Sequence, residues 1–468
     1  MSTNTAHILV YPFPAPGHII PLLDLTHLLL THGLSITLLI TPNNQPLLHS
    51  FLCSHTSSHL QHLVLPDPPR IRLLACMRSL RQQHYPILLN WFQSHPSPPF
   101  AIISDFFLGW THQLACQLAI PRLVFSPSGA FAFSVTTSLW RNQPQTENPN
   151  NVDFMLSFPE IPNSPTYPWW QISHIYRTSK EGDPNREFFR DCFLANFESW
   201  GVVINSFVEL ERVHIEHLKG NSGIGSDRVW SVGPLLLHDD GGSIGSLSRG
   251  GSSSVPCQQV ITWLEEKGDN SVVYICFGSR EMLTCKQMDE LASGLEKSGI
   301  NFIWSVRQPN ERHASAECGV LPDGFEDRVA GRGFIINGWA PQLAILRNRA
   351  VGAFLTHCGW NSVLEGIASG VVMLTWPMGA DQFINAELLV DQLGVGIRVG
   401  EDTQKILDSD ELARILAESV AENLPERQRS KKIKEAALTA VKGGSSDRDL
   451  DELVKRLIEL GNGRGVSK

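Results

Sequence analysis

Two separate parts of this chain alternate short apolar runs with helical patterns, and this alternation restricts the fold more than any other feature. The strands expected in the first part are 7–11, 35–41, 101–104 and 122–126, with a helix that ends near Gly33. The strands expected in the second part are 271–276, 302–306 and 353–356, with a helix over 286–297. Strands that alternate with helices pair in parallel and are covered by helices. The sequence therefore predicts an α/β protein with two doubly wound parallel sheets.

The length of 468 residues favours two or three domains, and a change of composition suggests where they meet. The segment 237–256 is rich in Gly and Ser, as flexible linkers are. Near the end of the chain, apolar residues recur at the spacing of one helix face, namely Leu450, Leu453, Val454, Leu457 and Ile458. We therefore expect a first domain over 1–236, a linker over 237–256, a second domain over 257–445 and a final helix over 446–468.

Charge and cysteine spacing argue against several classes of partner. The net charge is −9 and no long basic stretch occurs, which argues against nucleic acid or an anionic membrane as the main partner. The apolar segment 19–34 carries Asp24, His27 and His32, so it is expected to be a packed helix and not a membrane span. Nine scattered cysteines without a CxxC pair indicate reduced thiols and no metal site. No GxGxxG follows the first strand, so a nicotinamide site is not indicated.

The segment 339–382 carries a strand–turn–helix unit whose turn is polar: WAPQLAILRNRAVGAFLTHCGWNSVLEGIASGVVMLTWPMGADQ. The strand ends before His357, and a helix is expected over 363–368 with Asn361 or Ser362 as its N-cap. A helix N-terminus presents free N–H groups and a partial positive charge, which suit a diphosphate. Glu365 follows Asn361 by one helical turn, and its carboxylate can accept both hydroxyls of a ribose.

This segment resembles the plant secondary product glycosyltransferase box, the UDP-sugar signature of plant family 1 glycosyltransferases. The resemblance extends over essentially the whole chain. It implies the GT-B fold, with two Rossmann-like domains facing a central cleft and the last helix packing back on the N-terminal domain. It also implies a monomeric, cytoplasmic UDP-glycosyltransferase without stable membrane insertion, which needs no metal and uses its UDP-sugar as a co-substrate.

The resemblance assigns roles to individual residues. Trp339 and Gln342 are expected to hold the uracil, and Glu365 the ribose. The diphosphate is expected on His357, Asn361 and Ser362, with Ser279 as a second contact. The sugar hydroxyls are expected on Asp381 and Gln382, with Ser128 as a possible further contact. The complete set expected at the UDP-sugar is Ser279, Trp339, Ala340, Gln342, His357, Trp360, Asn361, Ser362, Glu365, Asp381 and Gln382.

His18 and Asp105 are the expected catalytic residues. His18 lies in the turn after the first strand, where a neutral imidazole suits general-base duty. Asp105 follows another apolar strand and can orient the second ring nitrogen of the base. The resemblance matches these two residues to the catalytic base and its activating aspartate. An ordinary helix-start histidine and an N-cap aspartate are the structural alternatives. No covalent nucleophile is recognised, which favours single-displacement inversion.

The sequence constrains the identity of the sugar donor and of the acceptor less strongly than it constrains the fold. Gln382 at the end of the box, with Trp360 where glucuronosyl users often have Arg, favours UDP-glucose in this family. UDP-rhamnose and UDP-galactose remain alternatives, as does a non-catalytic UDP-sugar-binding protein. The overall sequence resembles the subgroup that glycosylates flavonols and phenolic acids, so we expect β-O-glucosides of small phenolics. An aromatic wall for such an acceptor is one hypothesis for Phe106, Phe107, Trp110, Phe131 and Phe133, and packing in the core is the equal alternative for most of them. The loop 65–73 is shorter than in most of the family.

Overall fold

A computed structural model describes residues 6–55, 58–69, 72–146, 151–221, 223–237, 253–307, 319–402 and 405–463. The chain forms two compact units, one made of Met1–Asp240 with Thr439–Lys468 and the other of Gly241–Leu438. The first unit thus takes its last helix from the far end of the chain. Most of the expected linker 237–256 lies outside the described residues, as do positions 70 and 71 of the loop 65–73. No helix among the described residues is both long and apolar enough to cross a bilayer.

The first unit is built on a seven-stranded parallel sheet in the order β3-β2-β1-β4-β5-β8-β9. Its strands are β1 (His7–Tyr11), β2 (Ser35–Ile40), β3 (Leu60–Val64), β4 (Ala101–Asp105), β5 (Arg122–Ser126), β8 (Gly201–Ile204) and β9 (Val229–Ser231). Its helices are α1 (Pro16–Thr31), α2 (Gln45–Ser54), α3 (Leu73–Ser94), α4 (Thr111–Gln117), α5 (Ala130–Asn142), α6 (His174–Thr178), α7 (Pro184–Leu194), α8 (Val208–Asn221) and α17 (Ser445–Gly463). A small antiparallel pair, β6 (Met155–Ser157) with β7 (Thr166–Pro168), and single turns of helix, among them η2 (Phe106–Leu108), complete the unit.

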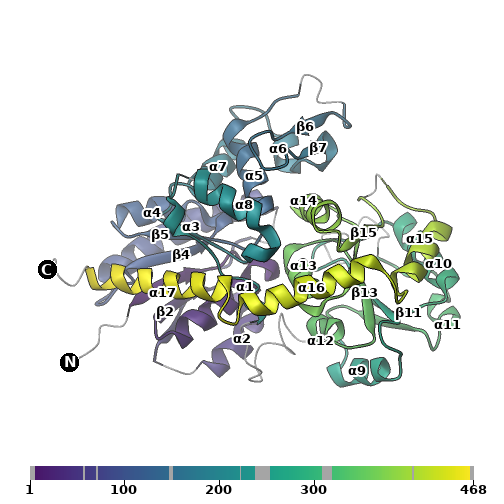
Figure 1. Ribbon diagram of the computed structural model, residues 1–468. Coiled ribbons are helices and arrows are strands. Elements are labelled where there is room, and N and C mark those ends of the chain that lie inside the picture. Colours follow the sequence, from purple (N-terminus) through teal and green to yellow (C-terminus); the bar gives the residue numbers. More distant parts are fainter. Residues whose placement is uncertain are drawn as a thin grey trace. The chain divides into compact units, whose positions relative to one another are not determined.

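Helix α17 (Figure 1, yellow) contributes apolar residues to the core of the first unit. It packs beside β9. Leu450, Leu453 and Leu457 are at most 1% exposed because they pack against the apolar residues of this sheet and of α1. Asp449 adds a polar anchor, since its carboxylate accepts from the Ser231 backbone N–H at 2.8 Å. One residue of the predicted apolar face is an exception: Ile458 remains 39% exposed.

The second unit has a six-stranded parallel sheet in the order β12-β11-β10-β13-β14-β15. Its strands are β10 (Val272–Cys276), β11 (Asn301–Val306), β12 (Gly333–Asn337), β13 (Val351–Thr356), β14 (Val372–Thr375) and β15 (Gly396–Arg398). Its helices are α9 (Cys257–Glu265), α10 (Cys285–Ser298), α11 (Phe325–Arg328), α12 (Gln342–Leu346), α13 (Trp360–Ser369), α14 (Gln382–Glu387) with a π turn over Leu388–Gln392, α15 (Ser409–Ser419) and most of α16 (Pro425–Ala440). The central strand β13 is buried along its whole length and β10 in all but its last residue, Cys276, as expected for a sheet covered on two faces.

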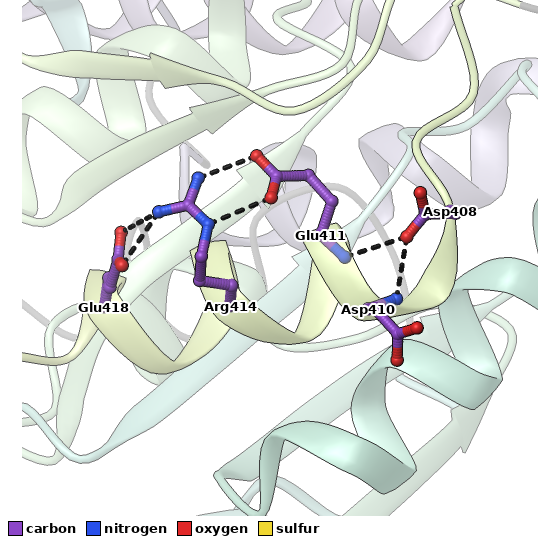
Figure 2. Close-up of polar contacts among 5 residues, drawn as sticks. All are labelled: Asp408, Asp410, Glu411, Arg414 and Glu418. Carbon is purple, nitrogen blue, oxygen red and sulfur yellow. Dashed lines mark hydrogen bonds and ion pairs between the residues drawn. The ribbon is translucent and has the colours of Figure 1, made fainter.

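Local polar contacts fix where helix α15 of the second unit begins. Asp408 caps α15, because its Oδ1 accepts from the backbone N–H groups of Asp410 and Glu411, each at 3.0 Å (Figure 2). On the same helix, the Arg414 guanidinium bridges Glu411 and Glu418 (Figure 2) and lowers the pKa of Glu411. Helix α15 therefore begins at Ser409, directly after this cap.

Candidate active site

His18 and Asp105 contact each other in the first unit. His18 lies in the first turn of α1 and Asp105 is the last residue of β4, and the two strands β1 and β4 are neighbours in the sheet. His18 Nδ1 is 2.8 Å from Asp105 Oδ2. The carboxylate is fully buried, whereas the imidazole keeps 15% of its side-chain surface exposed. Because a carboxylate only accepts, Nδ1 carries the proton and Nε2 is left as a base.

Asp105 is also the N-cap of η2. Its Oδ1 accepts from the Phe107 backbone N–H at 2.9 Å, while Oδ2 faces His18. The N-cap role and the His-orienting role, which the sequence offered as alternatives, are thus held by the two oxygens of one carboxylate. Capping fixes the direction of the carboxylate, so His18 is held in one orientation.

Three aromatic rings surround the imidazole of His18. Phe107 and Phe106 lie with ring centroids 4.9 and 5.7 Å away, and Phe13 approaches at 5.3 Å. Phe13 was not predicted, since its position before Pro14 has no signal beyond the turn. The other members of the hypothetical aromatic wall belong to the core.

Those core positions are explained by their partners. Phe131 stacks on His214 with centroids 4.1 Å apart, and Phe133 stacks on Phe197. Trp110 is 4% exposed and packs edge-on against Tyr11. The aromatic-wall hypothesis is therefore wrong for Phe131, Phe133 and Trp110, because helix α5 and the β4–α4 turn direct these rings inward.

Ser128 lies in the turn between β5 and α5, at the same edge of the sheet as Asp105. It is 9% exposed, and its carbonyl accepts from Ser126 Oγ at 2.9 Å. The nearby N-terminus of α5 is occupied by a buried carboxylate, because Glu211 accepts from the backbone N–H groups of Ala130 and Phe131 at 2.9 and 2.8 Å. The first N–H groups of α5 are therefore already bound by the Glu211 carboxylate of the protein itself.

In the second unit, three neighbouring strands end in register and bring most of the predicted residues to one edge. Cys276 of β10 pairs with Thr356 of β13, which pairs with Thr375 of β14. The turns that follow these strands contain Ser279, His357 and Asp381. The carboxyl ends of parallel strands are where α/β proteins bind their ligands.

His357 is enclosed by two glycines. A Cβ atom at Gly278 would lie 2.5 Å from both Cε1 and Nε2 of the imidazole, and one at Gly359 would lie 2.4 Å from Nε2. Both glycines are therefore needed to make room for this ring. Burial lowers the pKa of His357 to about 4, and its buried Nδ1 has no hydrogen-bond partner among the described residues. The ring is a neutral donor–acceptor at physiological pH.

Helix α13 begins earlier than the sequence suggested. Its N-cap is Gly359, with extended φ and ψ of −61° and 140°, and its first residue is Trp360. The N-cap prediction for Asn361 or Ser362 is therefore wrong, and these residues fall in the first turn. Glycine has no side chain, so the N-cap residue itself makes no side-chain hydrogen bond to the helix. This is a helix N-terminus of the kind that binds anions.

Polar residues of the box also contact one another. Gln342 Nε2 donates to Glu365 Oε2 at 2.7 Å and to Ser362 Oγ at 3.2 Å, and Tyr274 Oη donates to Gln342 Oε1 at 3.2 Å. Glu365 is 8% exposed, so this contact supplies a partner that a buried carboxylate requires. Trp339 is half-buried with its carbonyl bound by Ser254 N–H at 3.0 Å.

The remaining residues of the box follow β14. Asp381 precedes α14 and accepts from Asn385 Nδ2 at 3.2 Å. Gln382 is 5% exposed, and its Oε1 accepts from the backbone N–H groups of Met378 and Gly379 at 2.8 and 3.0 Å. The amide oxygen is thus used within the turn. Ala340 and Trp360 are buried, at 7% and 4% exposure.

Cys358 sits inside the site but is not suited to nucleophilic attack. It is fully buried, and burial raises the pKa of its thiol well above the usual range. Its φ of 65° lies in the left-handed region, and its N–H donates to Thr356 Oγ1 at 3.2 Å. The thiol therefore serves packing at a tight turn. Across the described ranges, no group of three or more His, Cys, Asp and Glu side chains is arranged to hold a metal ion.

Known proteins resemble this chain over almost its whole length. A sequence model of the family described as UDP-glucoronosyl and UDP-glucosyl transferase matches residues 244–424. The chain is 49% identical to UDP-glycosyltransferase 89B2 of Stevia rebaudiana, with 97% of this chain and 98% of that protein aligned. It is 48% identical to flavonol 3-O-glucosyltransferase UGT89B1 of Arabidopsis thaliana, with 97% of each protein aligned.

Solved structures support the same assignment. The crystal structure of Arabidopsis thaliana UGT89C1 with UDP-L-rhamnose matches with a TM-score of 0.79 and 38% identity, over 97% of this chain and 100% of that one. Another crystal structure of that protein contains quercetin and matches with a TM-score of 0.77 and 37% identity, over 97% and 100% of the two chains. The expected α/β fold of the GT-B class is confirmed. With near-complete coverage at almost half identity, this chain belongs to the plant family 1 UDP-glycosyltransferases and is a glycosyltransferase enzyme.

Proposed function

We propose that this enzyme is an inverting UDP-glucosyltransferase that forms β-O-glucosides of small phenolic acceptors, flavonoids in particular. The observation that carries the proposal is the contact between His18 Nδ1 and Asp105 Oδ2 at 2.8 Å, with the carboxylate buried and the imidazole partly exposed. A histidine oriented in this way is a general base for a hydroxyl group.

In the proposed reaction, His18 Nε2 accepts the proton of the acceptor hydroxyl. The acceptor oxygen then forms a bond to the anomeric carbon, while the bond from that carbon to the β-phosphate oxygen breaks. UDP leaves with the bonding electron pair, and the imidazolium later releases its proton to solvent. Displacement from the opposite face converts an α-linked donor into a β-glycoside. Asp105 stabilises the imidazolium and does not itself take the proton.

The UDP-sugar is assigned to the second unit. The N-terminus of α13 and the neutral His357 ring are proposed to supply N–H donors for the diphosphate, to which Ser279, Asn361 and Ser362 add polar side chains. Trp339 and Gln342 are proposed to hold the uracil, with Ala340 and Trp360 lining the site. Glu365 is proposed to accept the ribose hydroxyls. The negative charge that develops on the leaving UDP is thus stabilised by the fixed dipoles of these N–H groups.

Glucose is the proposed sugar because Gln382 ends the box. Its Oε1 is bound by two backbone N–H groups, so the amide nitrogen is the atom that Gln382 offers as a donor. Asp381 is proposed as the acceptor for the sugar hydroxyls, with Ser128 as a further contact. UDP-rhamnose is the second candidate donor, because a relative at 38% identity has been solved with UDP-L-rhamnose.

A flavonoid acceptor is proposed from two relatives. One is named a flavonol 3-O-glucosyltransferase, and another has been solved with quercetin. In this chain, Phe107 lies beside His18, is partly exposed and offers apolar surface to a flat ring. Phe13 and Phe106 also contact His18 but are buried. We further propose a monomer in the cytoplasm that needs no metal ion.

The test is a turnover assay that pairs UDP-glucose, UDP-rhamnose and UDP-galactose with kaempferol, quercetin and a hydroxybenzoate. Products are identified by mass, and the anomeric proton coupling reports their stereochemistry. We expect a β-linked hexose adduct from UDP-glucose. A deoxyhexose adduct from UDP-rhamnose alone would replace the proposed donor by the second candidate, and a product that retains the α-configuration would exclude inversion.

Two variants complete this test. His18→Ala is expected to remove turnover while UDP binding, measured by calorimetry, stays close to wild type. His32→Ala is the matched control because this histidine ends the same helix on the surface, where it contacts Asp451 at 3.5 Å. UDP binding without turnover by the wild-type enzyme on any acceptor would support a non-catalytic UDP-sugar-binding protein.

A further inference from the structure

Arg122 is a buried cation without a carboxylate on its guanidinium. It is the first residue of β5 and is 1% exposed, and no ion pair among the described residues includes it. Burial lowers the pKa of Arg122 to about 9, with Cys192 and Asp105 acting in the opposite direction. Burying a cation is costly unless its donors are satisfied, so this side chain needs a compensating role.

The guanidinium donates to a set of neutral acceptors. Nε donates to Ser104 Oγ at 2.8 Å, and Nη1 donates to Ser199 Oγ at 2.7 Å. Both Nη atoms share Asn196 Oδ1 at 3.1 Å, and Nη2 also reaches the Asp105 carbonyl oxygen at 3.4 Å. The planar fork of Arg suits such convergent contacts, which Lys cannot reproduce.

This network leads directly to the turn that carries Asp105. Asn196 is fully buried, and its Nδ2 donates to the Phe106 carbonyl oxygen at 3.0 Å. Ser104 Oγ is 2.8 Å from Thr111 Oγ1, which in turn donates to the Leu108 carbonyl oxygen at 2.6 Å. Carbonyl oxygens of the segment from Asp105 to Leu108 are therefore held from the protein interior. The side chains of Asp105, Phe106 and Phe107 contact His18.

We propose that Arg122 and Asn196 are positioning residues for acceptor activation. They fix the backbone at Asp105 and Phe106, so that the Asp105 carboxylate meets His18 Nδ1 in one orientation and leaves Nε2 for the acceptor. The guanidinium also places a positive charge behind the buried carboxylate. This inference rests on the proposed function, since it assigns His18 and Asp105 to the chemistry. A displacement of about 1 Å in such a group costs on the order of 100-fold in rate.

Arg427 in the second unit provides a matched control. It is 4% exposed and donates to the carbonyl oxygens of Gly352 and Ser419 at 2.9 and 2.7 Å, and to Asn270 Oδ1 at 3.2 Å. It thus has the same chemistry as Arg122, but its contacts include none of the residues proposed to bind or react. Loss of either arginine should lower stability, and only loss of Arg122 should lower kcat of the folded enzyme.

The decisive variant is Asn196→Asp. It keeps an acceptor for Arg122 and loses the N–H that holds the Phe106 carbonyl oxygen. We expect kcat to fall by about 10- to 100-fold, with the KM for donor and acceptor and the Kd for UDP within about threefold of wild type. Arg122→Met should reduce kcat more than Arg122→Lys, which retains the charge. Arg427→Met should leave kcat of the folded fraction unchanged.

The outcomes separate this inference from the proposed function. If folded Asn196→Asp and Arg122→Lys keep wild-type kcat, the network is only structural and the inference is wrong. If Arg122→Met does not fold, Asn196→Asp decides alone. If His18→Ala, measured in parallel, retains turnover, the proposed catalytic pair itself is wrong. All assays use whichever donor and acceptor the wild-type enzyme turns over.

Discussion

Gly278 lies directly against the ring of His357, so closely that a Cβ atom there would be 2.5 Å from two ring atoms. Gly278 also has φ of 75°, which a side chain rarely adopts. A glycine at this position also lets the backbone approach a bound diphosphate closely. The structure gives it a second task, because the glycine sets the position of the histidine that is proposed to bind that diphosphate.

Gly278→Ala is therefore expected to weaken UDP binding by about tenfold or more, because His357 must move and its hydrogen bond to an anion is lost. The backbone strain costs about 1 kcal/mol of stability as well. Gly299→Ala is the control, because Gly299 has φ of 68° and no atom within 4 Å of its Cβ position. Calorimetry with UDP distinguishes the two. If both variants bound UDP with equal affinity, His357 would not contribute to UDP binding.

The lowered pKa of His357 also predicts how stability depends on pH. Its pKa is about 4 in the folded chain and near 6.5 when unfolded. Below pH 6.5, His357 binds a proton in the unfolded chain but not in the folded chain. Its contribution to the free energy of unfolding is therefore fully present above pH 6.5 and is lost as the pH falls toward 4. The slope from one group is at most about 1.4 kcal/mol per pH unit. Urea unfolding at several pH values should show a smaller slope for His357→Gln, and an unchanged slope would contradict this origin.

Asp105→Asn tests the orientation of the base. An amide can still accept from the Phe107 N–H, but its NH₂ group then faces His18 Nδ1 and forces the proton onto Nε2. We expect kcat to fall by roughly 100- to 10,000-fold with UDP affinity unchanged. Asp183→Asn is the control, because Asp183 is also an N-cap of the first unit and accepts from the Asn185 N–H at 2.7 Å. Near-normal kcat in Asp105→Asn would leave this aspartate only its capping role.

The alternation of strands and helices was predictable because parallel strands buried on both faces leave a strong apolar signal. The family resemblance paired His18 with Asp105, and the structure brings them together because Asp105 ends β4 and His18 follows the neighbouring strand β1. The Asn361 or Ser362 cap was wrong because the chain stays extended through Gly359. Composition favours Asn and Ser at caps, but tertiary packing around His357 determines where α13 begins.

The network beneath Asp105 could not be predicted from local patterns. Arg122 begins a strand, and its partners Asn196 and Ser199 come from a segment more than 70 positions later, as the separations of 74 and 77 show. No periodicity relates these positions, and each residue alone is an ordinary polar residue. Likewise, Phe13 reaches His18 only because of the turn between β1 and α1.

The final helix supplies a test of packing. Leu453 is fully buried in the core of the first unit, and Ile458, on the same predicted face, is 39% exposed. Leu453→Ala removes buried methyl groups and leaves a cavity, so we expect the free energy of unfolding to fall by about 2–5 kcal/mol. Ile458→Ala should change it by no more than about 1 kcal/mol, because this side chain contacts water already. Urea unfolding followed by tryptophan fluorescence measures both, and kcat of the folded proteins should match wild type. Equal losses for the two variants would mean that α17 buries a different face.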